Sequence, residues 1–175
     1  MTLGDRIVIM KDGYIMQVGT PTEVFEMPRN LFVAEFIGAP KMNIIKTQLL
    51  SEGGKYYVTP FGAKILVDGE KGKALAEKKV QPGEILLGVR PEHIVLAPEG
   101  EGTIPCTLLV NEMMGSELHL HVETDDGTRL IVRVPTIGLD SRERSGLVAG
   151  HKMNISFEGK VMHFFDPGTE DNLLA

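Results

Sequence analysis

The clearest candidates for chemistry are two histidines, His119 and His121, that alternate with apolar residues. On a β-strand, residues i and i+2 project from the same face, so this pair could hold a metal ion together with Glu117 or Glu123. The alternative is an exposed polar strand face, with Leu118 and the next alternate residues turned inward. That alternation accounts for every residue of the segment. The sequence therefore favours the polar face and predicts no metal site.

Phosphate chemistry has three weaker candidates. A phosphate-binding loop needs glycine-rich backbone followed by Lys and a hydroxyl residue, but an alanine follows Gly72-Lys73. The segment Leu50–Lys55 could present amides to a phosphate only from a helix N-terminus, and strand-forming residues follow it. Asp12 after the apolar run Ile7–Met10 could hold magnesium, yet an Asp-Gly pair between apolar runs is typical of a hairpin turn. The sequence thus predicts no catalytic residue, no cofactor site and no enzyme activity in this chain.

The densest polar cluster is Arg90, Glu92 and His93, around Pro91. Pro91 disfavours helical backbone at Arg90, so a strand is expected to end there. Arg90 could hold a carboxylate across a dimer, or an effector anion. Alternatively it ties its own turn to a neighbouring loop, with Asp166 in the tail as a candidate partner, and the sequence favours this structural role. Arg90, Glu92, His93 and Asp166 are retained as candidate regulatory or dimer contacts.

Composition limits the classes of function. The chain has 175 residues, a formal net charge of −6, 42% apolar residues and 6% aromatic residues. An acidic chain without basic residues interleaved with aromatics is not expected to bind nucleic acid. The single Cys106 excludes an internal disulfide and is expected to be a small buried strand residue. No apolar run approaches the roughly 20 residues that span a bilayer, so we expect a cytoplasmic protein that meets the membrane only through a partner.

The first 40 residues have strong local signals. The runs 7–10 and 14–18 predict two strands joined by a tight turn. Thr20-Pro21-Thr22-Glu23 has the form of a capping box that begins a short helix. Asn30 is the expected cap of a second helix, 31–37. That helix is expected to bury one face, made of Phe32, Val33, Phe36 and Ile37.

After residue 40 the pattern changes to short apolar runs separated by Gly, Pro and Asp. Many short strands at such spacing are typical of an all-β barrel or sandwich. A weak helix is expected only at 73–79. The expected strands are 43–49, 55–59, 64–67, 85–89, 104–114, 118–123, 129–134, 153–157 and 160–165.

Three segments resemble one family of proteins. The hairpin and capped helix of residues 5–23, with the junction Ile37–Asn43, are similar to the end of the nucleotide-binding domain of ABC-transporter ATPases that drive sugar importers. The segment Gly88–Ile94 resembles the signature of the regulatory domain that follows in the maltose and multiple-sugar importer ATPases. Phe164-Phe165-Asp166, with Thr169 and the residues after it, is similar to their C-terminal tail.

The resemblance implies a mainly β fold in two parts. Residues 1–40 would be a small α+β remnant of the ATPase domain. Residues 41–175 would be the transport-associated regulatory domain, an OB-like antiparallel barrel. The parent subunit would bind ATP and Mg²⁺, dimerise, dock on permease subunits at the inner face of the membrane, and in some members receive signals from phosphotransfer proteins. The alternative is a barrel that binds a small oxyanion or sugar. Alone, residues 1–40 cannot bury their apolar faces, so they are expected to dock on the barrel, pair with a second copy or remain partly disordered.

Overall fold

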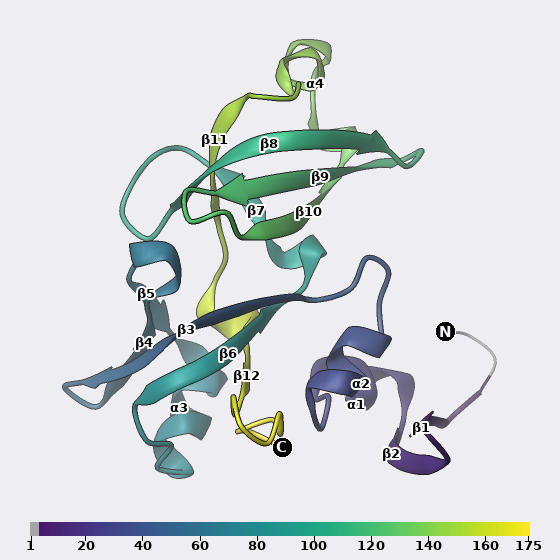
Figure 1. The fold of residues 1–175 in the computed structure, drawn as a ribbon, viewed down its shortest axis with the longest axis vertical. Coiled ribbons are helices and arrows are strands. Elements are labelled where there is room, and N and C mark those ends of the chain that lie inside the picture. The colour runs from purple at the N-terminus through teal and green to yellow at the C-terminus, as the bar shows by residue number, and fades with distance from the viewer. Residues whose placement is uncertain (1–3) are drawn as a thin grey trace.

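The computed structural model describes residues 4–175 (Figure 1). The described chain is mainly β, with a two-stranded hairpin and two five-stranded antiparallel sheets ordered β12-β6-β3-β4-β5 and β10-β9-β8-β11-β7. The strands are β1 (Ile7–Lys11), β2 (Tyr14–Gly19), β3 (Asn43–Glu52), β4 (Lys55–Val58), β5 (Ile65–Val67), β6 (Gly83–Val89), β7 (Val95–Ala97), β8 (Ile104–Met113), β9 (Glu117–Thr124), β10 (Arg129–Pro135), β11 (Lys152–Ser156) and β12 (His163–Phe165). The helices are α1 (Pro21–Glu26), α2 (Leu31–Phe36), α3 (Gly69–Glu77) and α4 (Ser141–Gly146), with 3-10 turns η1 (Pro60–Gly62), η2 (Pro91–His93), η3 (Thr136–Gly138) and η4 (Gly159–Val161).

The predicted hairpin turn and helix caps of the N-terminal unit, residues 4–40, are confirmed. Asp12 and Gly13 both have positive φ, 50° and 84°, as a tight hairpin turn between β1 and β2 requires. The Thr20 hydroxyl accepts from the Glu23 amide at 3.2 Å, and the Glu23 carboxylate accepts from the Thr20 amide at 2.8 Å. Asn30 caps α2 through its side-chain oxygen. Local backbone chemistry alone thus sets these elements.

The N-terminal unit lies against the barrel, so the docked arrangement is the one observed; residues 1–3 lie outside the described chain (Figure 1). Backbone hydrogen bonds of 2.9 Å join Leu31 to Glu170 and Asn172 to Arg29. The side-chain amide of Asn172 donates to the carbonyl of Pro28 at 2.7 Å. The C-terminal tail therefore holds the segment between α1 and α2 against the barrel.

Apolar packing supports the same docking. The unit has a small core of its own around Ile9, Val24, Val33 and Ile37. A second cluster crosses the junction, where Ala34 of α2 packs with Met42 and Phe165 of the barrel. One larger core lies between the two five-stranded sheets and contains the inward-facing residues of nearly every barrel strand. The unit is thus fixed by buried apolar contact as well as by the tail.

A side chain bridges the two five-stranded sheets at the edge of β10. Asn43, the first residue of β3, donates its side-chain amide to the Ile131 carbonyl at 2.9 Å and accepts from the Ile131 amide at 2.8 Å. Ile131 lies in β10, whose other edge pairs with β9. The asparagine amide therefore replaces a missing backbone partner on an edge strand, in the way that a further strand would.

Several expectations were wrong in detail. Phe36 is 61% exposed instead of buried, since it stacks on Phe32 at the surface, with ring centroids 5.7 Å apart. The segment 160–165 is a 3-10 turn followed by the short β12, and α3 begins at Gly69, earlier than expected. The short β7 and α4 were not predicted, since β7 has only three residues and α4 buries none of its side chains. Within residues 4–175, no helix has the length and apolar character needed to cross a membrane.

Candidate regulatory site at the junction of the two units

Arg90 lies at the junction between the N-terminal unit and the barrel. It follows β6 directly and is only 1% exposed. Its two terminal nitrogens donate hydrogen bonds of 2.7 Å each, Nη1 to the carbonyl of Ile37 and Nη2 to the carbonyl of Phe25. The guanidinium carbon also lies 3.6 Å from the centre of the Phe25 ring. One side chain of the barrel thus makes three contacts with the N-terminal unit.

The partners of Arg90 explain why an arginine suits this position. Phe25 is in the last turn of α1, and Ile37 is the C-cap of α2. Carbonyls at helix C-termini lack intrahelical donors and carry partial negative charge. The planar guanidinium can donate to two such carbonyls at once and stack on an aromatic ring, which a lysine ammonium cannot do in the same geometry. Burial lowers the pKa of Arg90 while the Glu92 carboxylate opposes that shift, and an arginine remains charged in proteins.

Of the four candidate contacts, the structure brings three together. Arg90, Glu92 and His93 share the turn η2, and the His93 amide donates to the Arg90 carbonyl at 2.9 Å. Asp166 is not a partner of Arg90, contrary to the suggestion from sequence. It accepts from the amides of Gly168 and Thr169 at 2.8 Å each, and the Thr169 bond is the larger cause that lowers the pKa of Asp166. Asp166 therefore orders the C-terminal turn.

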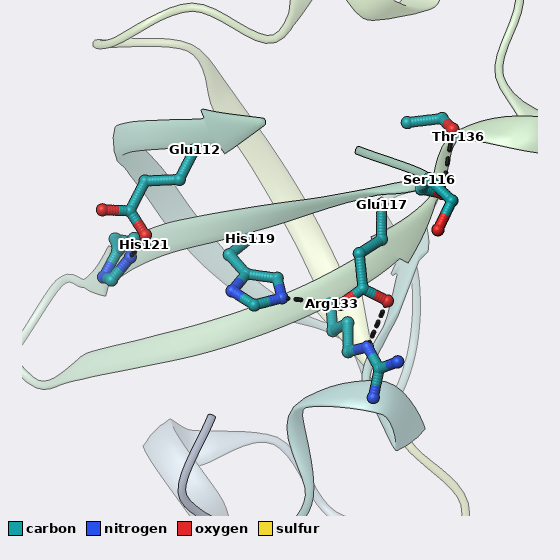
Figure 2. Close-up of polar contacts among 7 residues, drawn as sticks. All are labelled: Glu112, Ser116, Glu117, His119, His121, Arg133 and Thr136. Carbon is teal, nitrogen blue, oxygen red and sulfur yellow. Dashed lines mark hydrogen bonds and ion pairs between the residues drawn. The ribbon is translucent and has the colours of Figure 1, made fainter. Parts of the chain in front are cut away.

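Both histidines of the pair contact carboxylates (Figure 2). His119 Nε2 lies 2.9 Å from a Glu117 oxygen, and Glu117 also pairs with Arg133 across the strands. His121 Nε2 lies 3.0 Å from a Glu112 oxygen. The His119 hydrogen bond is the largest cause that lowers the pKa of Glu117, and the Arg133 hydrogen bond is the next. Among residues 4–175, no three His, Cys, Asp or Glu side chains are grouped as a metal site requires.

The strand alternation is confirmed, with one correction. Leu118, Leu120 and Val122 point into the core, as predicted. His119 shares the opposite face but is only 9% exposed, so it is not on an open surface. It lies on β9, between β10 and β8, with Arg133 and Glu112 as its cross-strand neighbours, and it contacts Glu117 on its own strand.

An exposed apolar tip lies at the turn between β8 and β9. Met113 and Met114 are 65% and 54% exposed, so they are surface residues and do not fill the core. Ile137 of η3 is 98% exposed. Figure 2 shows Thr136 beside Ser116, and both the amide and the hydroxyl of Thr136 donate to the Ser116 carbonyl at 2.9 Å. These bonds hold η3 next to the β8–β9 turn.

Comparison with known proteins assigns the barrel. Residues 38–94 match the MalK OB fold domain, and residues 87–165 match the TOBE domain. The chain is 38% identical to the uncharacterized ABC transporter ATP-binding protein YurJ of Bacillus subtilis, over 98% of this chain. The barrel belongs to the MalK OB fold and TOBE domain families, and the chain is similar to ABC-transporter ATP-binding proteins over nearly its whole length. It covers 46% of YurJ, so it spans a little under half the length of that relative.

Other relatives agree on the family. The oligosaccharides import ATP-binding protein MsmX of Bacillus subtilis is 34% identical, with 97% of this chain and 45% of that protein covered. The ATP-binding protein y4oS of Sinorhizobium fredii is 37% identical over 97% of this chain and 41% of its own length. A crystal structure of the molybdate-binding protein ModG has a TM-score of 0.55 at 14% identity, covering 71% of this chain and 96% of ModG. This likeness shows the fold alone. An OB-type, mainly β fold is thereby confirmed.

The sequence marked Arg90 as a candidate contact but gave no sign of its actual partners. Arg90 lies in the short overlap of the two family models, residues 87–94. Its partners are backbone carbonyls 53 and 65 residues away, and a carbonyl acceptor leaves no side-chain pattern in a sequence. Lys71 and His163, which line the same junction from α3 and β12, carried no motif. They are recognised as candidate site residues only because the fold brings them together at the junction.

Proposed function

We propose that this chain is the regulatory portion of the ATP-binding subunit of an importer for sugars. Two findings support the sugar assignment: the barrel matches the MalK OB fold domain, and a relative that is 34% identical imports oligosaccharides by name. The nucleotide chemistry would belong to the rest of the parent subunit, which would bind ATP and Mg²⁺. In this proposal the 175 residues bind no nucleotide and hydrolyse none.

The observation that carries the regulatory role is the Arg90 contact. Residues 4–37 precede both matched barrel domains, yet the relatives align over nearly the whole chain, so this unit would be the end of the ATPase domain. Arg90 holds the last turns of α1 and α2 through two hydrogen bonds of 2.7 Å. A rigid link of this kind would pass a displacement of the barrel to the ATPase domain, and the reverse.

The partners follow from the same assignment. The barrels of two copies would contact each other in a homodimer, and the parent subunits would dock on permease subunits at the inner face of the cell membrane. A regulator from a phosphotransfer system is a further candidate partner, while the acidic net charge of −6 disfavours nucleic acid. Titration of the chain with the host phosphotransfer proteins tests the regulator, and absence of binding would remove it from the proposal.

A chimera tests the proposal as a whole. The corresponding C-terminal portion of MsmX is replaced by this chain, and oligosaccharide uptake is measured in a strain that lacks MsmX. Uptake comparable to that with MsmX supports the proposal, because the junction and the barrel would then serve an importer. A chimera that folds and hydrolyses ATP but supports no uptake would contradict it.

ATP hydrolysis by the isolated chain, proportional to its concentration, would contradict the assignment of nucleotide chemistry to the rest of the parent.

The second candidate is a barrel that binds a small oxyanion or sugar, and the fold likeness to molybdate-binding ModG favours it. Thermal unfolding in the presence of molybdate, sulfate and free sugars separates the two functions. A large rise of the unfolding midpoint with one of these ligands, lost on substitution of residues inside the barrel, would favour the second candidate over the first.

A further inference from the structure

A cleft of about 390 Å³ lies at the junction of the N-terminal unit and the barrel, and one of its lining residues is Phe25, which Arg90 contacts. Its walls come from four parts of the chain that are distant in sequence. The end of α1 supplies Met27, α3 supplies Lys71, η2 supplies His93, and β12 supplies His163. Neither the ATP-binding family nor the proposed importer role assigns a ligand to this cleft.

Nitrogen groups without partners gather here. His163 is 5% exposed, and its Nδ1 atom is buried without a hydrogen-bond partner among residues 4–175. The Nδ1 atom of His93 and the Nε atom of Arg90 are also buried without a hydrogen-bond partner within the described chain. Buried polar groups normally have hydrogen-bond partners, so the two unpartnered imidazole nitrogens, on residues that line the cleft, point to a ligand that binds there.

Lys71 adds a positive charge that no carboxylate neutralises at short range. It forms no ion pair within the described residues, and its Nζ atom lies 4.0 Å from the sulfur of Met27. Burial lowers the pKa of Lys71, while the charge of Glu26 opposes that shift. Glu26 and Glu70 lie on the exposed rim, and Lys160, also at the rim, pairs with Glu158. The interior of the cleft is therefore more positive than its rim.

The histidines would be neutral donors in this setting. Burial lowers the pKa of His163 to about 3, and the positive charges of Lys71 and Arg90 add to that shift. Burial also lowers the pKa of His93, with Glu92 opposing and Arg90 adding to the effect. A neutral imidazole still donates one N–H, so each histidine can donate to a ligand oxygen near pH 7.

We propose that this cleft binds a small phosphate-class oxyanion. The Lys71 ammonium supplies the ion pair, and the imidazole N–H groups of His93 and His163 supply neutral hydrogen bonds. Because the end of α1 forms one wall, the bound anion lies between the N-terminal unit and the barrel and stabilises their contact. The cleft is thus an effector site, and it does not depend on which solute the parent imports.

The test is titration of the 175-residue chain with inorganic phosphate, sulfate and a hexose monophosphate, by calorimetry at low ionic strength. Imidazole NMR resonances of His93 and His163 are followed in parallel, because they report on the cleft itself. We expect saturable binding together with shifts of both imidazoles. Similar affinity for all three probes identifies a site for the free anion, and a preference for the hexose monophosphate identifies a phosphate monoester as the effector.

Substitutions locate the site. Lys71→Met is expected to weaken binding about tenfold or more, because of the two described lysines that line the cleft Lys71 is the one without a carboxylate partner. Lys73→Met is the matched control, since Lys73 lies on the same helix but is exposed and does not line the cleft. Binding that is equally weakened by both substitutions, or by neither, would overturn the proposal. So would the absence of binding and of imidazole shifts up to ~10 mM of every probe.

Discussion

The guanidinium of Arg90 lies 3.6 Å from the centre of the Phe25 ring and donates at 2.7 Å to the carbonyl of the same residue. Phe25 therefore presents both an aromatic face and a helix C-terminal carbonyl to one buried cation. The barrel residue and the α1 residue are 65 positions apart in the sequence. Their contact, with that of Ile37, adds to the tail hydrogen bonds and the apolar junction cluster that hold the N-terminal unit on the barrel.

Substitution of Arg90 by Met should destabilise the docked N-terminal unit by about 2–4 kcal/mol, because two buried carbonyls lose their donors. Arg90→Lys should recover only part of this loss, since an ammonium group cannot form both bonds and stack on Phe25. Urea denaturation measures the effect. Arg129→Met is the control, because Arg129 is an exposed arginine in a surface ion pair, and it should change the free energy of unfolding by about 0.5 kcal/mol or less.

Gly159→Ala should be strongly destabilising. A Cβ atom at this position would lie 2.5 Å from the Asp68 amide nitrogen and 2.6 Å from the Leu66 carbonyl oxygen, and backbone cannot move aside easily. We expect a loss of about 1–3 kcal/mol in thermal or chemical denaturation. Gly138→Ala meets no atom within 4 Å and should have little effect. Equal stability of the two variants would show that η4 does not pack on the end of β5 as described.

Asn43→Ala should weaken closure between the two five-stranded sheets. It removes both hydrogen bonds to Ile131 and leaves the amide and carbonyl of an edge strand without partners, at a cost of about 1–3 kcal/mol. Asn43→Asp keeps the acceptor but sets a carboxylate oxygen against the Ile131 carbonyl at a buried position, so it should be at least as destabilising as Asn43→Ala. Hydrogen exchange at the Ile131 amide is the direct readout, and unchanged protection in Asn43→Ala would contradict the described contact.

His163 should make stability depend on pH. Its folded-state pKa of about 3 lies below the ordinary value of 6.5, so the folded chain keeps this histidine neutral where the unfolded chain protonates it. The contribution of neutral His163 to the free energy of unfolding is then complete above pH ~6.5. It decreases by roughly 1 kcal/mol per pH unit as the pH falls toward ~3. His163→Gln should have a shallower slope in chemical denaturation over that range. Identical slopes in both proteins would mean that His163 titrates normally in the folded chain.

Local signals in the sequence were sufficient for the N-terminal unit. The Asp12-Gly13 turn and the Thr20–Glu23 capping box depend on residues within four positions of one another, so their patterns are readable without the fold. The barrel strands with strong alternation, such as β9, were also predictable. β7 and α4 were not, because β7 is only three residues long and α4 buries none of its side chains.

The candidate site was only half predictable. Pro91 and the polar residues around it marked Arg90, but the choice of Asp166 as a partner followed the expectation that a cation seeks a carboxylate. Backbone carbonyls of Phe25 and Ile37 satisfy Arg90 instead, and Asp166 is used in its own turn. Side-chain types reveal charge pairs across a sequence, whereas helix ends brought together by tertiary docking leave no such trace.

Hydrogen exchange of Arg90→Met compared with the wild-type chain tests the central claim most directly, namely that Arg90 holds the N-terminal unit on the barrel. We predict that amide protection in α1 and α2 falls by at least tenfold, while β8 and β9 keep theirs, because the barrel core does not depend on this contact. Unchanged protection in α1 and α2, or an equal loss across the whole chain, would contradict the claim.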